Sequence, residues 1–194
     1  VFFFYRTISK DIENINIGYL GLFGIFFVIF YSYFSNFLIP HSKVHNLVFI
    51  IIGLIIFLIN FFLKKIEKKQ VKILYLILIF FFVAILIFKN HDDFEYYHFP
   101  YTYLLTQHEQ IIGIGNFGHG FRTQSSIFYL NSLFYLPLID YYLFNLGTTL
   151  ILIFSNLIFL NYVFNNYSSQ NFKLKNLFFK YLCLLSFIFI NVFF

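Results

Sequence analysis

Long apolar runs alternate along this chain with short polar segments, and five of the runs are long enough to form apolar helices. They cover residues 17–39, 46–63, 73–88, 142–164 and 177–194. At 1.5 Å per residue, a helix of about 20 residues matches the hydrocarbon core of a bilayer, which is roughly 30 Å thick. The pattern therefore predicts an all-α, polytopic helical membrane protein with about five transmembrane helices, forming one membrane domain over residues 1–194.

Composition supports a membrane protein, because 60% of the residues are hydrophobic and only 11% are charged. A soluble domain needs more polar surface than this to cover its core. The one cysteine, Cys183, lies in the last apolar run and excludes an intrachain disulfide. The chain has no methionine, begins at Val1 and stops inside an apolar run at Phe194. We therefore expect an internal or amino-terminal piece of a longer protein, inactive on its own.

The orientation of the helices is indicated by residues 64–72, which contain five lysines. Basic loops remain on the cytoplasmic side, so this segment predicts a cytoplasmic amino terminus and an external segment over residues 89–141. That segment holds five of the eight acidic residues. We expect a multi-pass protein of the cytoplasmic (inner) membrane. The basic residues lie mostly in short loops, where they orient the helices, so the positive charge does not indicate binding to nucleic acid. Membrane lipids are the expected partners.

The apolar stretch Ile127–Leu138 is too short to cross a bilayer. Counting it as a crossing would also place Lys173, Lys175 and Lys180 outside. This stretch therefore predicts an interfacial helix within the external loop.

Polar side chains in or beside the apolar runs could join the helices by hydrogen bonds. They are Asn36, Asn60, Asn131, Asn145, Ser155, Asn156 and Asn161.

Three carboxylates and two histidines gather between His91 and His98, directly after the third apolar run. In a helix, Asp93 and Tyr97 share one face at i and i+4, with His98 beside them. A carboxylate at the membrane boundary can take a proton from an acceptor hydroxyl, and histidine can assist. Ionisable groups at this depth are usually functional, although solvated charges also commonly end a membrane helix. Asp93, Asp92 and His98 are the candidate catalytic residues.

A divalent cation held by this cluster is an alternative, but the spacing matches no closed zinc pattern. We therefore assign no metal ligands.

A second polar motif begins with Gly113, Gly115 and Gly118, which have the G-x-G-x-x-G spacing of a dinucleotide fingerprint. That fingerprint requires a βαβ unit, which an external loop between apolar helices does not provide. The glycines of Gly113–Gly120 instead allow tight turns or close approach to a ligand. His119 and Arg122 follow, and a guanidinium suits a phosphate or anchors the chain at the headgroup level.

The string Asp93-x-x-x-Tyr97-His98-Phe99-Pro100, after an outward-going helix, resembles the first external loop of bacterial multi-spanning glycosyltransferases of the GT-C superfamily. Gly113-Ile114-Gly115-Asn116 and Ser125-Ser126 are similar to its continuation. The resemblance covers roughly residues 90–136. It implies a polyprenyl-phosphate-type sugar donor and an envelope acceptor at the outer face. It also implies a key acidic residue at Asp93 and an interfacial helix at 127–138.

The resemblance further implies inversion at the anomeric carbon. Asp93, or alternatively Asp92, would deprotonate the acceptor hydroxyl. Arg122 with His119 would offset the charge of the leaving phosphate, and Tyr97 would contact the substrate. A transporter or flippase of lipid-linked glycans and a non-enzymatic scaffold subunit are the competing functions.

Overall fold

The computed structural model describes residues 16–63, 68–87, 92–122, 124–165 and 174–193, and within these ranges the chain is helical without strands. An isolated antiparallel bridge joins Leu136 and Asp140. The all-α prediction is confirmed. His91, residues 1–15 and residues 64–67 of the lysine-rich segment lie outside the described ranges.

Long helices form at each of the five apolar runs: α2 (Ile17–Leu38), α3 (Lys43–Leu63), α4 (Lys68–Ile87), α7 (Leu146–Asn165) and α8 (Leu174–Phe193). The bounds differ from prediction by a few residues. Helix α4 begins at Lys68 rather than at residue 73, because lysine and glutamine are good helix formers. Helix α7 begins at Leu146 rather than at residue 142, because residues 141–145 form turns.

Helix α2 is long and apolar enough to cross a membrane, judged by length and composition. Its first turn is capped by Asn16, whose side chain accepts a hydrogen bond from the Gly18 amide at 2.8 Å. Helices α3, α7 and α8 contain apolar stretches that are shorter than this: Lys43–Ile59, Leu146–Tyr162 and Leu177–Ser186.

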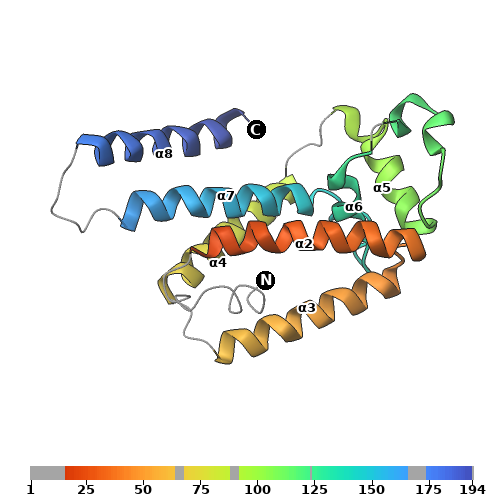
Figure 1. Ribbon diagram of the computed structural model, residues 1–194, viewed down its shortest axis with the longest axis horizontal. Coiled ribbons are helices and arrows are strands. Elements are labelled where there is room, and N and C mark those ends of the chain that lie inside the picture. Colours follow the sequence, from red (N-terminus) through yellow and green to blue (C-terminus); the bar gives the residue numbers. More distant parts are fainter. Residues whose placement is uncertain (1–15, 64–67, 88–91, 123, 166–173, 194) are drawn as a thin grey trace.

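Helix α7 packs against α2, α4 and α8 and so lies at the centre of the helical layer (Figure 1). Two glycines allow its close approach to α2. A Cβ atom at Gly18 would lie 2.6 Å from the Phe154 carbonyl oxygen, and one at Gly21 would lie 2.1 Å from the Phe154 ring. Larger residues at these positions would separate the two helices.

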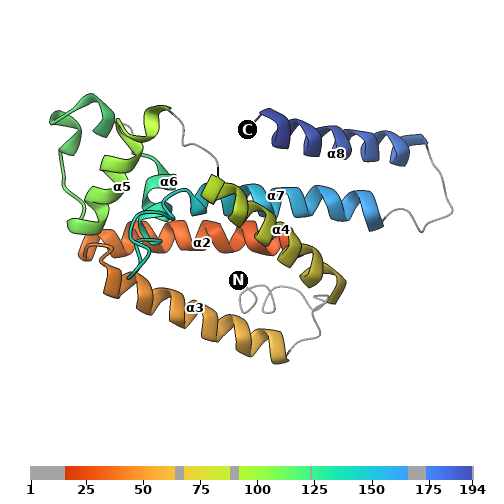
Figure 2. The ribbon, with the colours of Figure 1, turned by 180° about the vertical axis from the view of Figure 1, so that it is seen from behind.

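Shorter segments cover one end of the long helices and are called here the capping layer (residues 92–145). It contains η2 (Asp92–Phe94), α5 (His98–Gln107), η3 (Ile114–Asn116), η4 (His119–Phe121) and α6 (Ser126–Ser132). The layer surrounds the end of α2 that leads into α3, and the last turn of α3 and the first turn of α4 lie at the opposite end (Figures 1 and 2). At that opposite end, Asn161 donates a hydrogen bond to the Asn16 side chain at 3.0 Å.

The helix expected over residues 127–138 is shorter than predicted and more deeply placed. Helix α6 ends at Ser132, and its last five residues are all buried, so it is a core helix of the capping layer and does not lie on its surface. The chain then continues through turns, because Pro137 lacks a backbone donor and restricts the residue before it.

An aromatic core holds the capping layer together. Tyr101 and Leu105 of α5 meet Phe128 and Tyr129 of α6, and all four side chains are buried. Tyr33 of α2 stacks on Tyr129 with ring centroids 4.0 Å apart. The layer is thus packed directly onto the end of α2.

Candidate functional site

The candidate catalytic residues lie at the start of the capping layer. Asp93 belongs to η2, and a turn leads from it to His98, the first residue of α5. The Tyr97 hydroxyl donates a hydrogen bond to Asp93 Oδ2 at 3.3 Å. The i and i+4 pair therefore meets as predicted, although in a single turn, closed by the Tyr97 amide donating to the Asp93 carbonyl at 3.2 Å, rather than in an α-helix.

Tyr97 serves this pair as a hydrogen-bond donor. Burial of the ring raises the pKa of Tyr97, and the nearby Asp93 charge and their hydrogen bond raise it further. The phenol stays protonated at neutral pH and can hold the Asp93 carboxylate in one orientation. Asp92 precedes it as the first residue of η2.

His98 lies against aromatic rings. Its ring is 4.4 Å from the Tyr97 centroid in an edge-on arrangement and 5.1 Å from that of Phe128. The imidazole is half-buried at the margin of the aromatic core. The packing therefore limits its motion and leaves part of the ring open to solvent.

Gly120 brings the second polar motif to Tyr97. A Cβ atom at this position would lie 2.5 Å from the Tyr97 Cβ, so only glycine lets η4 approach so closely. His119 directly precedes Gly120, Arg122 lies two residues after it, and both side chains are exposed. The structure thus places η4 beside Tyr97 of the Asp93–Tyr97 pair. Of the two candidate phosphate ligands, His119 belongs to η4 and Arg122 follows η4 directly.

Side-chain packing fixes η3 and η4 in this position. Ile114 and Phe121 pack against the aromatic core, and Phe121 lies 5.7 Å from the Tyr101 ring. Gly113 adopts a left-handed conformation with φ of 83°, as a tight turn requires. The glycines therefore allow a tight turn, as predicted, and also the approach of η4 to Tyr97, which the sequence did not predict.

A buried polar cluster around His41 was not predicted from the sequence. His41 is fully buried, with Nε2 2.8 Å from Ser35 Oγ and Nδ1 2.6 Å from Ser132 Oγ. Burial lowers the pKa of His41 to about 3, so the ring is neutral at pH 7. Because Ser132 already donates to the Tyr129 carbonyl at 2.8 Å, we infer that Nδ1 carries the proton and that Ser35 donates to Nε2.

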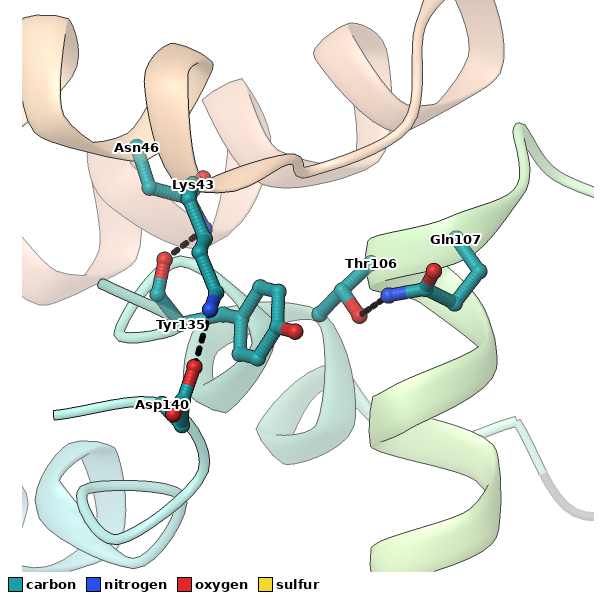
Figure 3. A network of polar contacts seen from close by, with 6 residues as sticks. All are labelled: Lys43, Asn46, Thr106, Gln107, Tyr135 and Asp140. Carbon is teal, nitrogen blue, oxygen red and sulfur yellow. Dashed lines mark hydrogen bonds and ion pairs between the residues drawn. The ribbon is translucent and has the colours of Figure 1, made fainter. Parts of the chain in front are cut away.

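Asn46 completes this cluster. Its side-chain nitrogen lies within 3.1 Å of three carbonyl oxygens, those of His41, Ser132 and Tyr135. Figure 3 shows its position beside Tyr135. The cluster joins the α2–α3 turn to α6 and has a structural role, since its side chains are sealed from solvent. Its signal in the sequence was the polar stripe Ser32, Ser35 and Asn36 on the otherwise apolar α2.

The predicted hydrogen bonding between helices is confirmed at several of the polar residues. Asn36 donates to the Leu105 carbonyl at 2.8 Å, and Asn131 accepts from the Gly147 amide at 3.0 Å. Asp140, which had no evident partner in the sequence, forms an ion pair with Lys43 (Figure 3).

Within the described part of the chain, no group of three or more His, Cys, Asp or Glu side chains is arranged to hold a metal ion. Comparisons with protein-family models, curated proteins and solved structures find no match to this chain. The chemistry at Asp93 must therefore be inferred from the residues around it.

Proposed function

We propose that the chain is a polytopic membrane protein in which α2, α3, α4, α7 and α8 cross the bilayer. The five helices contain 20 to 22 residues each, which is about 30 Å of helix. The side chains of residues 51–59 on α3 are all exposed and almost all apolar, as lipid contact requires. Lys68, Lys69 and Lys72 begin α4 at the end away from the capping layer, which supports a cytoplasmic location for that end.

Within this arrangement, we propose that the protein is a glycosyltransferase of the GT-C kind. It would transfer a sugar from a polyprenyl-phosphate-type donor to an envelope acceptor at the outer face. The observation that carries the proposal is the contact of Gly120 with Tyr97, which brings the segment of His119 and Arg122 against the residue that hydrogen-bonds Asp93. A carboxylate and a guanidinium on neighbouring segments suit a reaction that removes a proton and releases a phosphate.

In the proposed reaction, the Asp93 carboxylate accepts the proton of the acceptor hydroxyl. The acceptor oxygen then forms a bond to the anomeric carbon as the bond to the donor phosphate breaks, with inversion. Arg122, with His119, offsets the negative charge of the released polyprenyl phosphate. Tyr97 acts as a positioning residue through its hydrogen bond to Asp93.

The test uses the Gly120→Ala variant, whose added methyl group would overlap Tyr97 and push η4 away. We expect sugar transfer from a radiolabelled polyprenyl-phosphate donor, measured in membranes that contain the protein expressed from its complete reading frame, to fall about a hundredfold. Gly118→Ala is the matched control, because its Cβ would meet only Phe121 ring carbons at an ordinary 3.5 Å. Equal transfer by the two variants would show that the contact of η4 with Tyr97 has no role in the reaction.

A further inference from the structure

The turn between α6 and α7 holds large side chains away from the protein. Leu138 is 100% exposed and Tyr142 is 68% exposed, and Ile139 and Tyr141 are also exposed. Full exposure of a leucine side chain to water is unfavourable, because apolar surface prefers an apolar environment.

Two interactions hold the turn in place. The Asp140 amide donates to the Leu136 carbonyl at 2.9 Å, forming the isolated bridge between these residues. The Asp140 carboxylate pairs with Lys43 at the start of α3 (Figure 3). Leu138 lies between Leu136 and Asp140 in the chain, and its φ of 70° is a left-handed conformation that a leucine rarely adopts. The fold thus maintains the outward direction of this side chain.

The position of the turn indicates what it contacts. Lys43, the partner of Asp140, is followed directly by Val44, which is 72% exposed and begins the apolar surface of α3. The Lys43–Asp140 pair therefore joins the turn that carries Leu138 to the start of the surface that we assign to lipid. Tyr141 and Tyr142 stack with centroids 4.9 Å apart, and tyrosines are enriched where a bilayer meets water.

We propose that this turn inserts Leu138 into the outer edge of the bilayer hydrocarbon, with Tyr141 and Tyr142 at the headgroup level. The Lys43–Asp140 pair remains partly exposed to the polar headgroups. Lipid is favoured as the occupant because the turn continues the exposed apolar face of α3. The inference rests on the membrane arrangement proposed above and does not depend on the transferase reaction.

The test measures the environment of a spin label at Leu138→Cys, in a Cys183→Ala background, with the protein in phosphatidylethanolamine–phosphatidylglycerol nanodiscs. We expect collisions with oxygen to exceed those with a water-soluble nickel chelate several-fold. Leu54→Cys, on the exposed face of α3, gives the lipid reference, and Tyr96→Cys, at an 81% exposed residue of the capping layer, gives the water reference. Ile139→Cys gives the same test at a neighbouring exposed position, should Leu138→Cys fail to fold.

A label at Leu138 that behaves like the one at Tyr96 would overturn the insertion while leaving the membrane arrangement intact, provided that Leu54 reports lipid. A label shielded from both reagents would indicate a protein contact and would also overturn it. Access of the nickel chelate to Leu54 would contradict the membrane arrangement itself, and the insertion would fall with it.

Discussion

The Asp93→Asn variant is expected to lose sugar transfer while keeping its fold. Asparagine has the shape of aspartate and can still accept the Tyr97 hydrogen bond, but it cannot take a proton from an acceptor hydroxyl. Loss of a general base typically lowers a rate by about 10² to 10⁴. With the variant expressed from its complete reading frame, transfer from a radiolabelled polyprenyl-phosphate sugar in membranes should therefore fall to background, with the amount of protein in the membrane unchanged.

Glu95→Gln is the matched control for this variant. It removes a carboxylate two positions away, on an exposed side chain, and should leave transfer close to that of the unmodified protein. The transfer rate of Tyr97→Phe should lie between those of Asp93→Asn and Glu95→Gln, because this substitution removes only the hydroxyl that orients Asp93. If Asp93→Asn and Glu95→Gln transfer sugar equally well, Asp93 is not the base.

The largest expected effect on stability comes from Gly18→Val, at the contact between α2 and α7. The new Cβ would lie 2.6 Å from the Phe154 carbonyl oxygen and 2.6 Å from an Ile158 side-chain carbon. The carbonyl belongs to the α7 backbone, so it cannot move away without displacing the helix. Overpacking of this kind costs about 1 to 3 kcal/mol, and a backbone contact should give the upper end of that range.

The measurement is the unfolding of the purified protein in mild detergent, followed by circular dichroism. Gly53→Val provides the control, because it makes the same change on α3 at a glycine with no atom within 4 Å of a new Cβ. Both substitutions place a β-branched residue in a helix, so the difference between them reports the α2–α7 contact alone. Equal unfolding midpoints for the two variants would show that this close approach does not stabilise the fold.

Local spacing along the chain was sufficient to predict the long helices and the meeting of Asp93 with Tyr97. Both depend on contacts between residues close in sequence, which helical periodicity describes. The length of α6 was not predictable in the same way. Its apolar run continues past Ser132, and the turns that end it depend on Pro137 and on contacts with α3.

The remaining features depend on residues far apart in the sequence. His41 and Ser132 are separated by 91 positions, so no local pattern could relate them. The two partners of the Lys43–Asp140 ion pair are likewise far apart in the sequence. Gly120 could be assigned to a turn or to ligand approach from its sequence, whereas its contact with Tyr97 appears only once η4 packs on the aromatic core.

The central claim is that α4 and its neighbours cross the bilayer and hold the capping layer at the outer face. Labelling of single cysteines with a membrane-impermeant maleimide tests it most directly, using Tyr96→Cys and Lys72→Cys in the Cys183→Ala background. Both native side chains are exposed; Lys72 lies in the second turn of α4, so the rest of that helix separates it from Tyr96. The account predicts labelling at Tyr96 in intact cells and at Lys72 only after the membrane is permeabilised. Labelling of both positions in intact cells, or of Lys72 alone, would contradict it.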